Sequence, residues 1–517
     1  MTSVLILSGC GTSDEMIATL DSADTTDSLA NVSSMDNDVI SESGSVLTAE
    51  SMVDMATADM FTDRDLSGDS NEGASELILL DGESVTITKE GTYILSGALT
   101  DGMITVDVDD TEKVQLVLDG VEVSNSVGAA IYVKQADKVF ITLAEGTTNT
   151  LKSTGEFVAV DENNIDAVIF SKEDLTINGN GILTVESAQG HGIVSKDDLV
   201  IASGTITVNA ASKGLSGNDS IRIADGDISI TSGTDAIHAG NGEDTEKGFV
   251  YIENGTLQIS AGDDGIHADN VLLIAGGNIG ITKSYEGLEA LAIEIQDGEI
   301  SLVSDDDGLN AAGGNDNSGG WNDMFASQDG ALIHIAGGHL SVNAAGDGID
   351  SNGDLYMTGG NVYVSGPTNS GNGALDYNGT AQITGGVLMA VGASGMAQNF
   401  SESSTQGAVL VNANTNQAAG TEVNLLDSEG NVLVNYTSEK SFNSVVVSCP
   451  GLEVGKTYIL QIGSENTEIT LESLIYGNGQ GMGGFGGDFG GGMRGEQGFG
   501  GRNQEEFGGE RPDGRKK

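Results

Sequence analysis

A short motif that recurs along the middle of this chain constrains its fold more than any other feature. Each copy reads as a glycine or another small residue, an apolar residue, a β-rich run, a glycine turn and a second β-rich run. The apolar residues that mark successive copies are Val168, Ile193, Leu215, Ile237, Ile266, Leu288, Leu309 and Ile349. Five of the seven intervals between them span 21–25 residues, and the two longer ones contain insertions at 240–248 and 313–330. The middle of the chain is therefore a repeat array.

A unit of about 22 residues cannot bury its own apolar face, so successive copies must stack on one another. Leucine-rich repeats have a similar length, but the L-x-x-L-x-L-x-x-N pattern that they need is absent. Val, Ile and Thr fill the strand-like runs, Gly-Gly and Asn-Gly pairs separate them, and no helical period of convincing length is present. The sequence therefore predicts an all-β fold, a right-handed parallel β-helix with about 22 residues per coil.

Changes in composition divide the chain into five segments. Residues 1–10 read as a truncated lipoprotein signal, and residues 11–75, rich in Ser, Thr, Asp and Met, as an acidic disordered linker. The parallel β-helix is predicted over residues 76–400. Residues 401–476 read as a C-terminal β-domain, a small antiparallel piece that resembles a β-sandwich. Residues 477–517 form a Gly-rich low-complexity tail that holds the chain's only basic zone.

The signal at the start of the chain centres on Cys10. The run Leu7-Ser8-Gly9-Cys10 resembles the lipobox of bacterial lipoproteins, in which the cysteine becomes lipidated. Only Val4 to Leu7 form an apolar core before it and no basic residue precedes them, so we read a shortened signal; a chance match is the alternative. A diacyl anchor on Cys10 would hold the protein outside the cell, on the membrane surface. No other segment could span a membrane, because the sequence contains no run of about 18 apolar residues.

The formal net charge of −58 limits the partners of this chain. It excludes nucleic acid, because phosphate binding needs clustered Lys and Arg. It favours cations, or sugars that are reached through cations, while a surface adapted to high salt would have a similar charge. The aromatic content of 4% is low for a conventional enzyme core and suits a fold that buries β-branched side chains in layers. We expect a monomer.

Acidic residues recur at one position of the repeat. The residue before the small step is Asp235, Asp264, Glu286, Asp307 and Asp347 in successive copies. Three residues later the copies have His238, His267, Glu289, Asn310 and Asp350, and extra acids precede the first position at Asp263, Asp305 and Asp306. Equivalent residues of a β-helix stack about 4.8 Å apart, where two carboxylates repel by about 3–4 kcal/mol at an effective dielectric near 20. A column of such carboxylates needs protons or cations.

Calcium is the cation that this column predicts, because one ion that bonds oxygen at about 2.3–2.6 Å can bridge two coils. The expected ligands are Asp235, Asp263, Asp264, Glu286, Asp306, Asp307, Asn310, Asp347 and Asp350, with turn carbonyls completing the shell. One alternative is that these aspartates only form turns, which explains single copies but not the runs at 263–264 and 305–307. Zinc on His238 and His267 is a further alternative that the oxygen-rich surroundings disfavour.

Two aromatic residues in the 313–330 insertion are candidate sugar contacts. Trp321, the only tryptophan, and Phe325 lie there among acidic residues, and aromatic faces stack on sugar rings. A loop anchored by its own aromatic residues is an equally good interpretation.

Part of the sequence resembles a known family. The stretch "GTYILSGALTDGMITVDVDDTEKVQLVLDGVEVSNSVGAAIYVKQADKVFITLAEGTTNTL" and the D-G-I repeats are similar to clostridial carbohydrate-binding β-helix proteins, over about residues 77–475. The resemblance implies binding of cellulose and of acidic plant sugars such as polygalacturonate, and a fold similar to calcium-dependent pectate lyases. It also implies calcium in the acidic corner, with matching positions at Asp235, Asp263, Asp264, Glu286, Asp306 and Asp307.

Three functions remain open at this point. The favoured one is a non-catalytic, cell-surface protein that binds plant-type polysaccharide, either cellulose or acidic pectin-like glycans. The second is a calcium-dependent polysaccharide lyase, which needs a Lys or Arg base near the metal; Lys213 and Lys283 are the only cations near the column. The third is a surface adhesin or spacer without sugar specificity.

Overall fold

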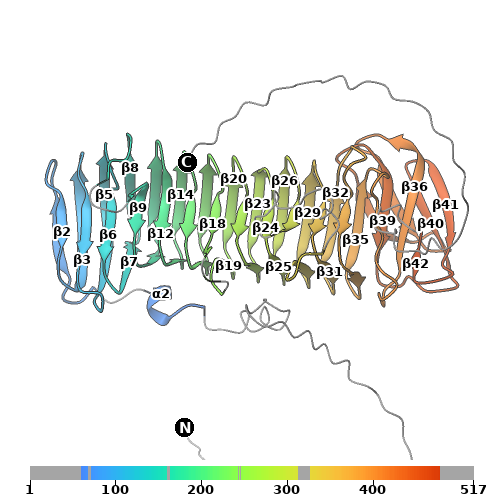
Figure 1. Cartoon of the computed structure of the whole chain (residues 1–517), viewed down its shortest axis with the longest axis horizontal. Helices are drawn as coiled ribbons and strands as arrows, with labels where there is room; N and C mark the ends of the chain where they lie inside the picture. Colours follow the sequence, from blue (N-terminus) through green and yellow to red (C-terminus); the bar gives the residue numbers. More distant parts are fainter. Residues whose placement is uncertain are drawn as a thin grey trace, which may run out of the picture. The chain divides into compact units, whose positions relative to one another are not determined.

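The computed structural model describes residues 60–67, 71–159, 164–242, 244, 246–312 and 327–477. They lie in one compact unit, Ser45–Lys517. Strands make up almost all of the regular structure, and the single helix among the described residues is α2 (Asp63–Ser67). No helix in this part of the chain is long and apolar enough to cross a membrane. The strands wind into a parallel β-helix that ends in an antiparallel β-region (Figure 1).

Each coil of the β-helix contributes one strand to each of three faces. The first face is a 12-stranded parallel sheet of β2 (Val85–Ile87), β4 (Ile104–Asp107), β6 (Ile131–Gln135), β9 (Ala167–Ser171), β12 (His191–Ser195), β15 (Leu215–Gly217), β18 (Ile237–Ala239), β21 (Ile266–Ala268), β24 (Leu288–Ala290), β27 (Leu309–Ala311), β30 (Ile349–Ser351) and β33 (Leu375–Tyr377). The second face contains β7 (Lys138–Leu143), β10 (Asp174–Gly179), β13 (Asp198–Ile201), β16 (Ser220–Ile223), β19 (Phe249–Ile252), β22 (Val271–Ile274), β25 (Ala292–Ile295), β28 (Leu332–Ile335), β31 (Asp354–Met357) and β34 (Ala381–Ile383). The third face contains β8 (Thr148–Ser153), β11 (Ile182–Ser187), β14 (Thr205–Ala210), β17 (Asp227–Ser232), β20 (Thr256–Ser260), β23 (Asn278–Lys283), β26 (Glu299–Ser304), β29 (His339–Ala344), β32 (Asn361–Ser365) and β35 (Val387–Gly392).

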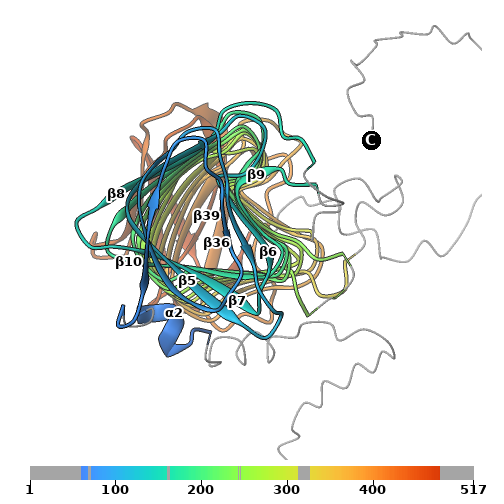
Figure 2. The ribbon, with the colours of Figure 1, turned by 90° about the vertical axis from the view of Figure 1, so that its left-hand side faces the viewer.

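The second and third faces join at the N-terminal end of the β-helix. There β1 (Ser75–Leu79), β3 (Gly91–Leu99) and β5 (Lys113–Asn125) pair side by side. The long strand β5 pairs with β7 through its first part and with β8 through its last part. Seen from this end, the chain passes from β6 to β7, β8 and β9 in a clockwise sense as it recedes (Figure 2). A β-helix that winds in this sense is right-handed, as parallel crossover connections generally are. The predicted fold class is confirmed.

The apolar markers of the repeat stack inside the β-helix. Ile237, Ile266, Leu288, Leu309 and Ile349 pair in register along the first face and are at most 1% exposed. The marker expected in the earliest copy is wrong by one residue, because Ile193 pairs with Ile169 and not with Val168. Both residues are fully buried, as is the rest of β9, so the alternation of inward and outward residues is not visible there.

The C-terminal β-region closes the far end of the β-helix. β39 (Phe442–Ser448) pairs antiparallel with β35, the last third-face strand, and with β36 (Ala408–Gln417), which also pairs with β42 (Ile475–Tyr476). A separate antiparallel sheet contains β37 (Glu422–Leu426), β38 (Val432–Thr437), β40 (Thr457–Ile462) and β41 (Glu465–Thr470). Apolar residues between these strands form a second core, which includes the buried free thiol of Cys449. This is the antiparallel piece that the sequence predicts.

Residues 60–67 correct the expectation of a disordered linker over residues 11–75. Asp65 of α2 is 2% exposed, and its carboxylate lies 2.9 Å from Lys138 Nζ and accepts a 2.5 Å hydrogen bond from Thr176. Burial raises the pKa of Asp65, but the bonds from Thr176 and Lys138 outweigh it and bring the pKa to about 2. The Arg64 guanidinium lies 4.3 Å from the centre of the Phe140 ring. Polar partners on the second face therefore hold this short helix in place.

Candidate functional site

The acidic column predicted from the sequence lies at the turn that enters the first face. The N–H of the residue after each acid donates a hydrogen bond of 2.9–3.0 Å to the carbonyl oxygen of the acid in the next coil. These bonds stack the five acids in one line: Asp235, Asp264, Glu286, Asp307 and Asp347. The residue after each acid is small because the coils approach closely there. A Cβ on Gly287 would overlap the carbonyl oxygen of Gly308 in the next coil. The same register places Lys213, and before it His191, at the N-terminal end of the column.

A second column runs beside the first on the outward side of the first face. Its members pair in register and are Ser216, His238, His267, Glu289, Asn310, Asp350 and Asp376. Side chains of the two columns meet, because they leave neighbouring positions of the same coil. The first face therefore has a polar corner that continues over several coils.

Three predicted ligands meet near the N-terminal end of this corner. Asp235, Asp263 and Asp264 offer carboxylate oxygens within 4.8 Å of one another. Asp235 already has nitrogen partners, since its Oδ2 lies 2.8 Å from His238 Nδ1 and 3.5 Å from the Lys213 ammonium. Burial raises the pKa of Asp235, but the bond from His238 and both positive charges outweigh it and lower the pKa to about 2. We call these three carboxylates the compensated group.

A second set of three predicted ligands meets further along the corner. Asp307, Asp347 and Asp350 also bring carboxylate oxygens within 4.8 Å of one another. Burial and the neighbouring charge of Asp307 raise the pKa of Asp347 to about 8, and Asp376 and Asp306 add to the effect. The main-chain N–H of Gly373 donates to Asp347 Oδ1 and only partly offsets the rise. We call these three carboxylates the acidic group.

The surroundings of the acidic group are rich in oxygen. A Cβ on Gly346 would overlap Oδ1 of both Asp306 and Asp307, so the glycine leaves room beside these two carboxylates. Asn310 is 3% exposed; its Nδ2 donates a 2.9 Å hydrogen bond to Glu286 Oε2, while its Oδ1 is buried without a hydrogen-bond partner. A buried carbonyl oxygen of this kind calls for a donor or a cation. Oxygen-only donors suit a hard cation such as Ca²⁺.

Glu286 lies between the two groups. Besides accepting from Asn310, it donates its main-chain N–H to Asp264 Oδ1 at 3.2 Å. Among the described residues it is not a member of either group of three carboxylates. The structure therefore divides the predicted ligands into two groups with Glu286 as the link.

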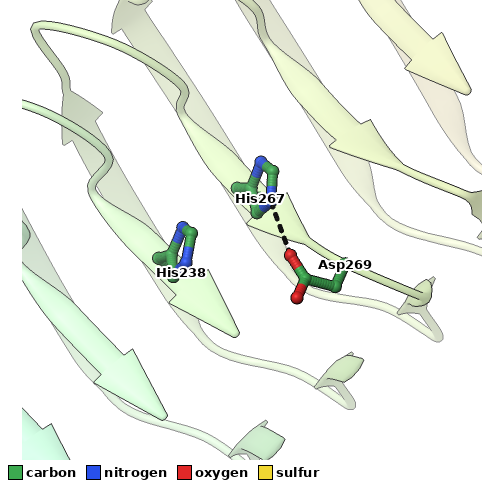
Figure 3. A group of neighbouring side chains, drawn as sticks. All are labelled: His238, His267 and Asp269. Carbon is green, nitrogen blue, oxygen red and sulfur yellow. Dashed lines mark hydrogen bonds and ion pairs between the residues drawn. The ribbon is translucent and has the colours of Figure 1, made fainter. Parts of the chain in front are cut away.

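The two histidines that the sequence offered as an alternative zinc site form a further cluster with an aspartate that was not predicted. The rings of His238 and His267 stack with centroids 4.5 Å apart and planes 10° apart, and His267 Nε2 lies 3.2 Å from Asp269 Oδ1 (Figure 3). His267 Nδ1 contacts the carboxylate of Glu289 and lies 3.6 Å from Asp264 Oδ2. Burial lowers the pKa of His267, but the bonds to Asp264, Asp269 and Glu289 outweigh it and raise the pKa to about 12. Burial lowers the pKa of His238.

Asp269 was missed because it follows the first-face strand β21 and so lies outside both columns. The signal that could have found it is its position two residues after His267, where a strand places alternate side chains on one face.

The residues predicted to contact sugar lie outside the described residues, as does Cys10. An aromatic residue that the sequence analysis passed over lies on the turn that enters the corner. Tyr285 is 45% exposed and is bonded through its backbone to Asp263 and Asp306, which precede the acid in the neighbouring coils. An aromatic residue at a position that is acidic in both neighbouring coils was the available signal.

The two lysines considered as lyase bases differ in their surroundings. Lys213 is tied to Asp235, and burial lowers its pKa although Asp235 opposes the shift. Lys283 is exposed at the end of β23, one coil before Asp307.

The fold and the polar corner define a class of protein, a right-handed parallel β-helix with carboxylates and histidines along one edge of a face. Residues 81–330 match the model of a family described as carbohydrate-binding domain-containing protein. A curated relative from Acetivibrio thermocellus with the same description is 45% identical over 128 residues, which is 24% of this chain and 45% of the relative. The match thus spans less than half of that relative's length.

A solved structure is also similar to this chain. It is described as the polysaccharide lyase-like protein from C. thermocellum, gadolinium derivative. The similarity covers 40% of this chain and 93% of that chain, with 38% sequence identity and a TM-score of 0.37.

Proposed function

We propose that this chain binds an acidic, plant-type polysaccharide through calcium held by the acidic group, and that it does not cleave the polymer. The observation that carries the proposal is the meeting of Asp307, Asp347 and Asp350 within 4.8 Å at a position where burial and like charge raise the pKa of Asp347 to about 8.

Calcium relieves the repulsion in this group. Two ionised carboxylates at the spacing of neighbouring coils repel by about 3–4 kcal/mol at an effective dielectric near 20. A divalent cation between them replaces that repulsion with attraction. The three carboxylates, Asp306 and the unpartnered Oδ1 of Asn310 supply oxygen ligands. Calcium takes about six to eight oxygens, which leaves positions for water or for a ligand.

An acidic sugar suits those remaining positions. A uronate carboxylate supplies the hard oxygen that calcium prefers. Tyr285 offers an exposed aromatic ring in the same corner, where a sugar ring can stack. The corner continues along the coils with a repeat of about 4.8 Å, so it offers a linear polymer a linear surface. The family of residues 81–330 is described as carbohydrate-binding, which supports this class of ligand. Neutral cellulose lacks the carboxylate and serves as the comparison ligand.

Binding without cleavage is the favoured form of this function. Lys213 lies four coils before Asp307 in the column, or about 19 Å at the usual strand spacing, and its ammonium is tied to Asp235. A base at that distance cannot take a proton from a sugar bound at the acidic group. Lys283 lies closer, so a calcium-dependent lyase remains the second candidate function. We further propose that the protein acts as a monomer outside the cell, anchored through a lipid on Cys10; an adhesin or spacer would share this placement.

Binding to polygalacturonate and to insoluble cellulose, each with calcium and with chelator, tests the proposal. We expect polygalacturonate to be retained only with calcium, and the retention to be lost in Asp347→Asn. Asp227→Asn removes an exposed carboxylate at the opposite end of a third-face strand and should bind as the parent does. Equal binding with and without chelator would contradict the calcium role, and binding to neither polymer would favour a spacer.

The lyase alternative has its own readout. Elimination creates an unsaturated product that absorbs in the ultraviolet, so incubation with polygalacturonate and calcium should give no rise in absorbance. A rise that disappears in Lys283→Ala would establish the lyase in place of the binding protein.

A further inference from the structure

We propose that His238, His267 and Asp269 bind a borderline divalent metal ion such as Zn²⁺, at a site separate from the acidic group. The site stands on its own geometry and does not depend on the proposed function. The three residues come from β18, from β21 and from the turn that follows β21, and they offer ligand atoms within 4.8 Å of one another.

The arrangement of the two imidazoles is the first support. His238 and His267 occupy the same position of neighbouring coils and pair in register, so their rings stack nearly in parallel. Stacking in register aligns the two Nε2 atoms on one side. Asp269 lies on that side, with its Oδ1 3.2 Å from His267 Nε2 (Figure 3).

The second support is the partner of each Nδ1 atom. His238 Nδ1 lies 2.8 Å from Asp235 Oδ2, and His267 Nδ1 contacts the carboxylate of Glu289. Metal-binding histidines usually direct their other ring nitrogen to a carboxylate or a carbonyl, which orients the ring and makes the free nitrogen more basic. Both histidines have a carboxylate beside Nδ1, within ion-pair distance for His238. Nε2 of each lies near Asp269, and a metal that binds there displaces the proton that His267 Nε2 shares with Asp269.

The third support is the space beside these ligand atoms. A Cβ on Gly240 would lie 2.8 Å from His238 Nε2 and 3.2 Å from Asp269 Oδ2. Any side chain at this position would therefore fill the space in which an ion meets these two ligands. The side chains of His238 and Asp269 are 20% and 36% exposed, so an ion can enter from solvent.

Donor chemistry separates this site from the acidic group. Two imidazole nitrogens and one carboxylate oxygen suit zinc and its first-row neighbours, whereas calcium prefers oxygen alone. Three protein ligands leave a fourth position open, as in many zinc sites. Zinc and calcium should therefore bind this protein together, each at its own site.

Calorimetric titration of the full chain with ZnCl₂, after removal of metals and in saturating CaCl₂, tests the proposal. We expect one tight Zn²⁺ site that calcium does not displace. The His238→Gln/His267→Gln variant should lose at least tenfold in affinity, and Asp347→Asn should keep the parent affinity. His334→Gln is the matched control, because His334 Nδ1 also lies 3.2 Å from a carboxylate, that of Glu294, while its Nε2 meets Thr358.

Gly240→Ala keeps all three ligands and only fills the space between them. It should also weaken Zn²⁺ at least tenfold, which decides the question even if the double histidine variant folds poorly by circular dichroism. Visible absorption of the Co²⁺-substituted protein should show a nitrogen- and oxygen-ligated ion and should disappear in Gly240→Ala. The proposal is overturned if Zn²⁺ does not bind, or if its affinity is unchanged in both variants. A loss in Asp347→Asn would likewise overturn a separate site.

Discussion

The two ends of the polar corner contain the same residue type at equivalent positions of the repeat, yet they differ in charge balance. At Asp235 the neighbours are Lys213 and His238, and the pKa of the carboxyl is lowered to about 2. At Asp347 the neighbouring charges are carboxylates, first Asp307, and with burial they raise the pKa to about 8. The repeat thus determines the position of each carboxylate, while the charges of residues in adjacent coils determine whether it needs an external cation. Calcium is expected at the acidic group for this reason.

The largest effect is expected at the compensated group. Asp235→Asn removes the carboxylate that Lys213 and His238 share and leaves their polar atoms in a largely buried place. Breaking a buried ion pair by removing one partner costs roughly 3 kcal/mol. Chemical denaturation in chelator should show this loss of unfolding free energy. An unchanged midpoint would mean that solvent, and not Asp235, satisfies the Lys213 ammonium and His238 Nδ1.

Calcium should give the next largest effect, and only through the acidic group. An ion that binds the folded state alone stabilises it by about 2.7 kcal/mol at a hundred times its dissociation constant. We expect calcium to raise the melting temperature of the parent by the shift that corresponds to this stabilisation. Asp347→Asn should abolish most of the shift, whereas Asp235→Asn should keep it. A shift that survives in Asp347→Asn would place the ion elsewhere.

When calcium is absent, replacing aspartate by asparagine should lower the unfolding free energy at Asp235 and raise it at Asp347. Asp347→Asn removes a carboxyl group whose ionisation is opposed by burial and by Asp307, and should raise the unfolding free energy in chelator at neutral pH by a few kcal/mol.

This gain should depend on pH. With its pKa raised from 3.8 to about 8, the folded protein keeps the Asp347 proton over a range in which the unfolded chain has lost it. The parent therefore loses stability relative to Asp347→Asn as pH rises from 3.8 to about 8, and the gain levels off above that. Denaturation at several pH values in chelator checks this. A pH-independent difference would contradict the raised pKa.

The smallest effect is expected at Tyr285. Tyr285 is 45% exposed, so Tyr285→Ala should change the unfolding free energy by no more than about 0.5 kcal/mol. Loss of a stacked sugar should weaken polysaccharide binding by about 1 kcal/mol, or roughly fivefold, without changing calcium affinity. Affinity electrophoresis in polygalacturonate measures this loss of affinity, with Tyr93→Ala as a control on a distant coil. An equal loss of affinity in Tyr93→Ala would contradict the role of Tyr285 in sugar stacking.

The sequence predicted the parts of this molecule that follow from the repeat. The interval between Ile266, Leu288 and Leu309 sets both the coil length and the stacking of the acids two residues before each marker. The family resemblance agrees with the match of residues 81–330.

Other parts of the molecule depend on tertiary contacts that the repeat pattern of the sequence does not reveal. The earliest marker was misplaced by one residue because Val168 and Ile169 are both buried, and α2 is a single turn whose stability comes from Asp65 meeting Lys138. The division of the acids into two groups depends on which coil supplies a cation, as Lys213 does. Asp269 joins the histidines only through the turn after β21.

Diffraction from calcium-soaked crystals, recorded for the anomalous signal of calcium, tests the central claim most directly. The account predicts a peak among Asp307, Asp347 and Asp350, with the Asn310 oxygen turned toward it, and no peak among Asp235, Asp263 and Asp264. A peak confined to the compensated group, or no peak in saturating calcium, would contradict it.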